Sequence, residues 1–407
     1  MRDKDVRPTP ALRTDRGPGR DDGDDAGRVR GDVPSHGRRA VRAGGAWGDG
    51  GVSPSEFPQR DAGIVSGGGQ RPSGAGRADG GAVWPTGGGA CPAGPDFRLT
   101  PPSGGYVWWY VDAISDDGAH GITVIAFLGS VFSPYYAWSR RRGGGDPMQH
   151  CALNVALYGR KKRWSMTERG AEAVSRGRDF LAIGPSTMSW DGTALTVEIR
   201  EISVPLPRSI RGTVRLYPSA VEHAPLVLDT AGRHRWQPIA PCARAEIRFD
   251  RPDLRWSGSA YFDTNNGDRP LEADFVRWDW SRTPVPGGTA IVYDVQRRDG
   301  SALHARRYDA KGGMRDFDPG PVSSLPRTLW RVPRFMHGAA PSLTGTLEDT
   351  PFYARSLVSA TVSGHRSTGF HEALVLDRFA SSWVQAMLPF RMPRVAGKIS
   401  GSSPARN

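Results

Sequence analysis

The chain has 407 residues, enough for two or three domains with sizeable cores, and it carries a net charge of +12. It contains neither an apolar run of about 18 residues nor the apolar core of a signal peptide, so we expect a cytosolic protein that does not span a membrane. Three cysteines lie far apart, and they indicate neither a zinc site nor a disulfide framework: Cys91, Cys151 and Cys242.

The first 93 residues are dominated by Gly, Arg, Asp, Pro and Ser, as in GPGRDDGDDAGRVRGD. Such a segment has no apolar periodicity and buries too little surface to offset its conformational entropy, so we predict that residues 1–93 are disordered. It holds 14 basic and 12 acidic residues, which leaves about +10 of the charge in the remainder. We expect residues 396–407 to form a flexible tail.

From residue 106 onward, apolar runs alternate with turn residues. Runs at 121–132 and 150–159 are rich in β-forming residues and are bounded by Gly or Pro. The alternating stretches 187–204 and 289–309 each contain an Asp-Gly pair, Asp191-Gly192 and Asp299-Gly300, which is typical of a type I′ hairpin turn. Closely spaced strands of this kind predict an antiparallel all-β fold, either a sandwich or a barrel.

Helices are expected only at 167–177 and 379–388. GGYVWWYVDAISDDG and GSAYFDTNNGD both place an aromatic strand before an Asp and a polar turn, which favours two similar units. PIAPC is typical of a linker and puts the boundary near residue 243. We therefore predict two β-barrels, at 94–242 and 243–395, each of a size that can enclose a ligand.

Two dense basic runs stand out, SRRRGGG at 139–145 and YGRKKRW at 158–164. A basic surface favours an acidic partner such as anionic lipid, nucleic acid or an anionic substrate. No motif that reads nucleic acid accompanies these runs, so no nucleic-acid partner is expected. Solvated loops and contact with an anionic membrane surface are the two interpretations that stay open.

Two pairs of residues could form a reactive pocket. His234 and Trp236 are two apart, as are Tyr261 and Asp263, so on strands each pair shares a face. If the faces converge, aromatic walls would raise the pKa of the carboxyl group and stabilise a cation, as protonation of an alkene requires. The alternatives are that Asp263 caps the turn TNNGD and that His234 is a hydrogen-bonded structural residue.

Several long segments, in this order, resemble the carotenoid 1,2-hydratases, also called hydroxyneurosporene synthases. They are GGYVWWYVDAISDDGAHGITVIAFLGSVFSPYYAWSRRRG, DPMQHCALNVALYG, RWSMTER, HRWQP, AYFDTNNGDRPLE and FVRWDWSR. The resemblance covers about residues 95–395 and is not expected to extend into the first 93. It implies a fold of two lipocalin-like antiparallel β-barrels.

The resemblance also implies an activity. It is that of a cofactor-independent hydro-lyase, which adds water across the terminal C-1,2 double bond of acyclic carotenes such as neurosporene and lycopene. Such enzymes act in the spheroidene and spirilloxanthin routes of purple photosynthetic bacteria. The family's HxW and YxD motifs imply Asp263 as the acid, Trp236 and Tyr261 as the shield of the cation, and His234 as the residue that orients the carboxyl group or the water. Asp268 is the reserve acid.

A carotene dissolves in the bilayer, so we expect peripheral contact with the intracytoplasmic membrane. The segment FASSWVQAMLPFRMPR could supply that contact, or it could be a helix packed on a barrel. Two other functions compete with hydration. One is a non-catalytic carotenoid or lipid carrier on the same barrels. The other is a carbohydrate-active sandwich that pairs Asp263 with Asp274 or Asp279 across a polar cleft.

Overall fold

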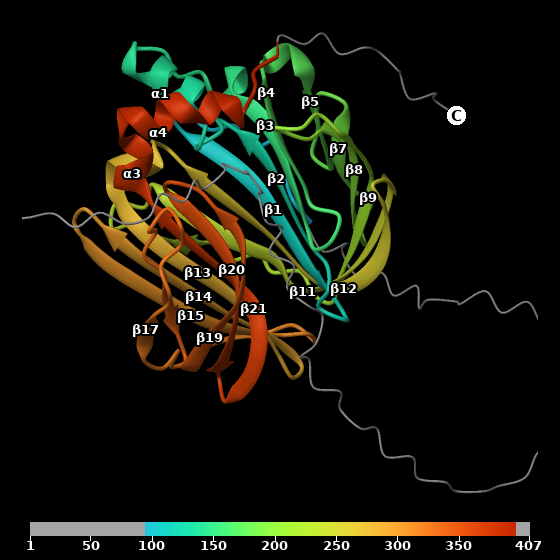
Figure 1. Ribbon diagram of the computed structural model, residues 1–407, viewed down its shortest axis with the longest axis vertical. Coiled ribbons are helices and arrows are strands. Elements are labelled where there is room, and N and C mark those ends of the chain that lie inside the picture. Colours follow the sequence, from blue (N-terminus) through green and yellow to red (C-terminus); the bar gives the residue numbers. More distant parts are fainter. Residues whose placement is uncertain (1–93, 396–407) are drawn as a thin grey trace, which may run out of the picture. The chain divides into compact units, whose positions relative to one another are not determined.

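The computed structural model describes residues 94–395 (Figure 1). The expectations of a disordered segment at 1–93 and a flexible tail at 396–407 lie outside the described residues. Within residues 94–395 the chain is mostly β-strand, arranged in two large antiparallel sheets and one two-stranded sheet. The prediction of an antiparallel, mostly β fold is therefore confirmed.

The first sheet has the order β4-β3-β2-β1-β12-β11-β9-β8-β7-β6-β5, and β10 pairs with β11 off this path. Its strands are β1 (Tyr106–Ser115), β2 (Gly121–Leu128), β3 (Cys151–Tyr158), β4 (Arg163–Arg169), β5 (Val174–Arg176), β6 (Phe180–Ile183), β7 (Ser186–Trp190), β8 (Leu195–Ile202), β9 (Ser209–Pro218), β10 (Leu226–Val227), β11 (His234–Arg251) and β12 (Asp253–Gly267).

The second sheet has the order β16-β15-β14-β13-β21-β20-β19, and β17 pairs with β18 apart from it. These strands are β13 (Phe275–Val285), β14 (Gly288–Arg297), β15 (Gly300–Asp309), β16 (Met314–Asp316), β17 (Val322–Ser324), β18 (Phe335–His337), β19 (Ala339–Asp349), β20 (Tyr353–Val362) and β21 (His365–Val375). The helices are short: α1 (Pro134–Arg141), α2 (Leu271–Asp274), α3 (Leu376–Ala380), α4 (Ser382–Met387), and the 3-10 turns η1 (Pro147–Gln149), η2 (Ala171–Ala173) and η3 (Leu388–Phe390).

The first sheet curls into a nearly closed barrel. Where β4 approaches the end of β8, the backbone N–H of Val204, just after β8, donates to the carbonyl of Trp164 on β4 at 2.9 Å. The buried Arg169 of β4 pairs with Glu201 of β8 at 2.8 Å. The barrel interior is filled by apolar side chains, which on β1 are the odd-numbered ones such as Trp109. This interior is therefore a packed apolar core.

The even-numbered side chains of β1 belong to a different core. Tyr106, Trp108 and Tyr110 pack with residues of β13, β14 and β21 rather than with the barrel interior. Because successive side chains of a strand point to opposite faces, β1 buries one face in the barrel and the other against the second sheet. The outer wall of the barrel and the second sheet thus form a shared apolar layer.

The prediction of two barrels is confirmed only in its coarser part, as one nearly closed barrel and a second sheet. The second sheet ends at β16 and β19, which do not pair with each other among the described residues. The linker expected near residue 243 instead lies inside β11. This strand pairs with β12 before and after that point, and from Ala243 onward it also pairs with β9. The two large sheets separate between Gly267 and Phe275. A division into two domains stays a prediction.

Several local expectations differ from the structure. Residues 167–177 form strand ends and a 3-10 turn instead of a helix, because β4 is paired along its length with β3. The hairpin near 191 has a four-residue loop, in which Asp191 accepts hydrogen bonds from the N–H groups of Thr193 and Ala194. The second hairpin turns at residues 298–299, because Arg297 pairs with Gly300. The helix expected at 379–388 is present as α3 and α4, separated at Ser381.

Candidate active site between the barrel and the second sheet

The register of three strands brings the predicted residues to one face. On β12, Asp263 lies opposite Tyr110 of β1, and on β11 Trp236 lies opposite Asn265. The segment TNNG continues β12 to Gly267 instead of turning. The alternative that Asp263 caps a turn is therefore wrong, because the residue lies within a strand that pairs on both sides.

Asp263 accepts two hydrogen bonds on the same carboxyl oxygen. The Tyr261 hydroxyl donates to Oδ2 at 2.7 Å, and the indole N–H of Trp236 donates to it at 2.9 Å. The other oxygen, Oδ1, is buried and has no hydrogen-bond partner among the described residues. The structure thus brings Trp236, Tyr261 and Asp263 into direct contact, so the faces of the two pairs converge, which the two-residue spacings alone left open.

Burial raises the pKa of Asp263 to about 8, although the hydrogen bonds from Tyr261 and Trp236 act in the opposite direction. The negative charges of Glu372 and Asp112 add to the increase. At neutral pH the carboxyl group is therefore protonated. Because Oδ2 already accepts two hydrogen bonds, the proton is best placed on Oδ1, where it is free to be donated.

Asp263 lines a small cavity between the sheets, the acid cavity. Its walls are mostly aromatic, and they come from β1, β12, β13, β14 and β21: Trp108, Tyr110, Asp263, Asn265, Trp278, Trp280, Tyr293 and Glu372. Ring faces attract a cation, so a positive charge formed next to Asp263 would be stabilised without a full counter-ion. The two tryptophans of RWDWSR, which as a pattern suggest core packing, are part of this wall.

A larger hollow, the apolar cavity, adjoins the acid cavity. The two cavities share Trp108, Tyr110, Trp278 and Glu372 in their walls. The rest of the apolar cavity is lined largely by apolar and aromatic side chains that include Phe127, Phe132, Met166, Phe352, Leu374, Leu388 and Met392. Asp263 belongs to the wall of the acid cavity and not to that of the apolar cavity.

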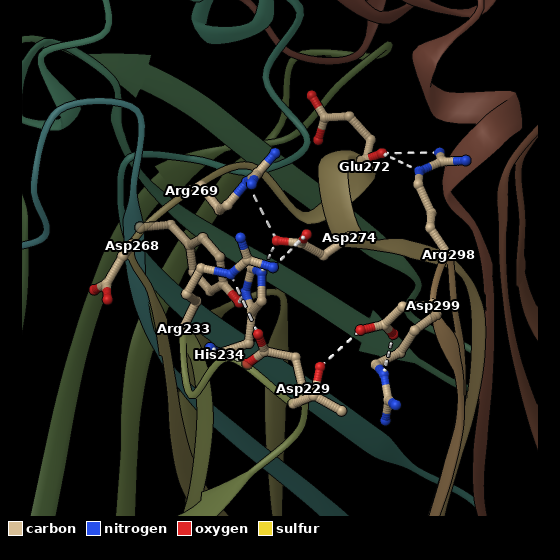
Figure 2. A network of polar contacts seen from close by, with 12 residues as sticks. Asp229, Arg233, His234, Asp268, Arg269, Glu272, Asp274, Arg298 and Asp299 are labelled. Carbon is tan, nitrogen blue, oxygen red and sulfur yellow. Dashed lines mark hydrogen bonds and ion pairs between the residues drawn. The ribbon is translucent and has the colours of Figure 1, made fainter.

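His234 lies on the same face but does not contact Asp263. Its Nε2 is 2.8 Å from Asp274 Oδ2, and its Nδ1 is 2.9 Å from the Tyr106 hydroxyl (Figure 2). Burial lowers the pKa of His234, against the raising effect of Asp274. With a neutral ring, Nε2–H donates to the Asp274 carboxylate and Nδ1 accepts from Tyr106. The Tyr106 ring stacks on Trp108 at 4.9 Å between centroids, so His234 supports the cavity wall from behind.

The other candidate carboxylates lie away from the acid cavity. Asp268 is exposed and points away from the network around Asp274, with Arg235 at 3.9 Å (Figure 2). Asp274 is occupied by Arg233, Arg269 and His234. Asp279 accepts from Arg277 at 2.6 Å and from the backbone N–H of Phe335 at 2.8 Å. The aromatic walls around Asp263 do not fit the polar cleft that a pair of glycosidase carboxylates requires.

Five polar residues near the cavity are not among the predicted site residues. Tyr110 lies with its hydroxyl 2.9 Å from Glu372 Oε1 and 3.0 Å from Asp112 Oδ2. Arg355 pairs with Glu372, and Arg282 lies 2.6 Å from Asp112 with both side chains fully buried. The available signal was a carboxylate within an apolar strand, as in YVWWYVD and FHEALVL, since a buried charge requires a partner.

Within residues 94–395, no helix is long and apolar enough to cross a membrane. The same residues include no group of His, Cys, Asp or Glu side chains arranged to hold a metal ion. Cys151 and Cys242 are both free and buried.

The family model described as "Carotenoid hydratase CrtC" matches residues 124–400. The acyclic carotenoid 1,2-hydratase of Thiocapsa roseopersicina is 51% identical over 380 residues, covering 92% of this chain and 94% of that protein. The enzyme of the same name from Rubrivivax gelatinosus is 50% identical and covers 91% and 94%. Kievitone hydratase from Nectria haematococca, a solved structure, covers 68% of this chain and 92% of its own at 10% identity, with a TM-score of 0.42, too distant for a comparison of folds.

The relatives also correct the expected extent of the resemblance. A match to 92% of this chain must reach into the first 93 residues, because that segment is longer than the uncovered share. The acyclic carotenoid 1,2-hydratase of Cereibacter sphaeroides, 43% identical, is covered over 99% of its length by 67% of this chain. The extent of the family match and these identities lead to one conclusion: the chain belongs to the carotenoid 1,2-hydratase family.

Proposed function

We propose that the protein hydrates the terminal C-1,2 double bond of acyclic carotenes such as neurosporene and lycopene, forming a tertiary 1-hydroxy carotenoid. The observation that carries the proposal is Asp263, a carboxylic acid that stays protonated at neutral pH in a cavity with aromatic walls. The reaction needs an acid, a base and water, and no cofactor. The names of the relatives supply the substrate class.

The proposed reaction starts with the transfer of the Oδ1 proton of Asp263 to C-2. The π electrons form the new C–H bond, and C-1 becomes a tertiary cation. Tyr261 and Trp236 then hold the new carboxylate through their hydrogen bonds to Oδ2, which are stronger to an ionised acceptor. The rings of Trp278, Trp280 and Tyr293 surround the cation until water attacks C-1.

The apolar cavity holds the polyene in this proposal. A substrate without polar groups offers no hydrogen bonds for recognition, so its position depends on shape and on the removal of apolar surface from water. Since the apolar and acid cavities share walls, the chain end enters the acid cavity while the remainder stays among apolar side chains. This arrangement favours a terminal double bond over an internal one.

Incubation of the purified protein with lycopene or neurosporene, followed by chromatography and mass spectrometry, tests the proposal. We expect a product heavier than the substrate by one water, with the hydroxyl group at C-1. Stoichiometric binding of the carotene without such a product would instead indicate the carrier function, for which the same apolar cavity would serve. The absence of both binding and product would refute the proposed substrate class.

We further propose that the protein acts from the cytoplasmic side and docks on an anionic membrane. Five exposed apolar side chains lie on two segments that meet where Trp330 contacts Trp383, and we call them the apolar rim: Leu329, Trp330, Trp383, Met387 and Phe390. The rings of Trp330 and Trp383 stack at 6.2 Å. Leu388 and Met392, from the same C-terminal segment, line the apolar cavity, so the rim adjoins the place where a carotene would be held.

Charge supports an anionic bilayer as the occupant of this surface. Arg327 and Arg331 are exposed on either side of Leu329 and Trp330. Cations next to exposed tryptophans are typical of surfaces that bind at the headgroup level, where basic residues contribute about 1 kcal/mol each. Phe390, which is 82% exposed, would otherwise remain in water at a cost.

Flotation with lipid vesicles tests the docking. We expect the protein to float with vesicles that contain phosphatidylglycerol, and to bind less as salt increases. The double substitution Trp383→Ser and Phe390→Ser should release it, whereas Leu303→Ser, at an exposed apolar position outside the rim, should not. Equal flotation of the double variant and the parent protein would refute the role of the rim.

A further inference from the structure

Hydration requires a base as well as an acid, because the water that attacks the cation must lose a proton. Asp263 lies on β12 of the first sheet, on one side of the acid cavity. Glu372 lies on β21 of the second sheet and lines both the acid cavity and the apolar cavity. A double bond within the acid cavity would therefore lie between two carboxyl groups on facing sheets.

Glu372 has one oxygen engaged and one available. Its Oε1 accepts from the Tyr110 hydroxyl at 2.9 Å and pairs with Arg355. Its Oε2 has no hydrogen-bond partner among the described residues, and the side chain remains 14% exposed. A water molecule in the cavity can therefore donate to Oε2 while the carboxylate is held in place from the other side.

Arg355 explains how Glu372 can be ionised next to apolar walls. Burial raises the pKa of Glu372, but the Arg355 charge and the Tyr110 hydrogen bond favour the carboxylate. Arg355 is itself 1% exposed and lies over the rings of Tyr110 and Phe370, at 5.4 and 5.7 Å from their centroids. When the carboxylate is neutralised by a proton, these ring faces still stabilise the guanidinium charge.

Asp112 is the other carboxylate near Asp263, and its geometry does not suit this role. It is fully buried and is not part of the cavity wall, and its Oδ1, which accepts no hydrogen bond from the described residues, is engaged in an ion pair. Oδ1 lies 2.6 Å from Arg282, and Oδ2 lies 3.0 Å from the Tyr110 hydroxyl. Asp112 thus helps to position Tyr110 rather than contacting the reacting atoms.

We propose that Glu372 is the catalytic base, which accepts the proton of the water that attacks C-1, and that Tyr110 and Arg355 are its positioning residues. The oxygen lone pair of the water forms the C–O bond, and the proton of the resulting oxonium passes to Oε2. That proton then returns to Asp263 through water in the shared cavity, which restores both groups. The inference rests on the proposed function.

Deuterium exchange separates the two half-reactions. In D₂O, Asp263 delivers deuterium to C-2. A cation that returns to the alkene by losing the original hydrogen of C-2, or a hydrogen of a C-1 methyl group, leaves that deuterium in the recovered carotene. In Glu372→Gln, water capture fails while the cation still forms. We expect at least a hundredfold loss of hydration, within the usual range for general acid-base catalysis, together with retained deuterium uptake. Asp263→Asn should lose both hydration and uptake.

Glu372→Gln leaves Arg355 without its counter-ion, so folding of the variant is checked by its melting temperature. Glu372→Asp keeps the ion pair but withdraws the carboxylate, and it should likewise retain exchange while hydrating poorly. The double variant Glu372→Gln with Arg355→Met preserves neutrality and should behave as Glu372→Gln does.

Near parental hydration in a folded Glu372 variant would overturn the inference, as would parallel loss of hydration and exchange. If the parent protein itself forms no hydroxylated carotene, the proposed function fails, and this inference falls with it.

Discussion

Replacement of Asp263 by Asn should remove the activity and stabilise the protein. The folded state keeps the carboxyl group protonated up to about pH 8, whereas the unfolded chain ionises it from its ordinary value of 3.8. Between these values the native state binds a proton that the unfolded state releases, so stability falls as pH rises. Each pH unit costs about 1.36 kcal/mol, and at pH 7 the cost relative to a neutral side chain is about 4 kcal/mol.

The asparagine removes this cost but adds a smaller one. Its carbonyl oxygen can accept from Tyr261 and Trp236 as Oδ2 does now, while its amide group takes the site of Oδ1, which has no partner. An unsatisfied buried donor costs about 1–3 kcal/mol. We therefore expect Asp263→Asn to be more stable at pH 7 by about 1–3 kcal/mol, and its advantage should grow by about 4 kcal/mol between pH 5 and pH 8.

Urea unfolding at pH 5, 7 and 8, with turnover of lycopene measured in parallel, checks both expectations. The matched control is Asp268→Asn, since Asp268 is exposed and outside the cavity; this variant should change neither activity nor the pH dependence of stability. Hydration by Asp263→Asn at the parental rate would refute the role of Asp263 as the acid. A stability difference that does not vary with pH would refute the protonated state.

Three further predictions follow from the same geometry. Trp236→Phe should reduce turnover of lycopene less than Trp236→Ala, because the phenyl ring keeps an aromatic side chain packed against Tyr293 of the cavity wall while both variants lose the hydrogen bond to Asp263; equal rates would exclude a role for the ring. The turnover number should fall above about pH 8, where Asp263 ionises, and a flat profile to pH 10 would contradict this. Removal of residues 1–90 should leave lycopene turnover nearly unchanged, since a shorter relative is covered over 99% of its length by 67% of this chain; loss of turnover would show that the segment contributes.

The sequence was sufficient to place side chains on the correct faces of their strands. A spacing of two put Tyr261 on the same face as Asp263 and Trp236 on the same face as His234, and the structure shows that the two faces meet, because Trp236 contacts Tyr261 and Asp263. Strand assignment failed where pairing with distant segments dominates, as at 167–177, where pairing with β3 overrides a local preference for helix. The predicted positions of the two hairpin turns were wrong by one or two residues, because the position of a turn depends on the register of both strands.

The polar residues contributed or paired by the second sheet could not be predicted from the sequence, for a physical reason. Tyr110 and Glu372 are 262 positions apart in the chain, and their contact depends on how the second sheet is placed against the barrel. Nothing in the local pattern around Glu372 specifies that placement. The same applies to Arg355, whose partner is set by the pairing of β20 with β21.

The aromatic run at the start of β1 links the fold to the chemistry. A strand with one solvated face alternates apolar and polar residues, but Tyr106 to Val111 is apolar or aromatic throughout, because the barrel interior buries one face and the second sheet the other. The acid cavity is built in that second layer, with Asp263 from one sheet and Glu372 from the other. Neither sheet alone encloses a carboxyl group in aromatic walls. The raised pKa of Asp263 is thus a property of the assembled pair of sheets, and any change that separates them should return the group to an ordinary, ionised carboxylate before the strands themselves unfold.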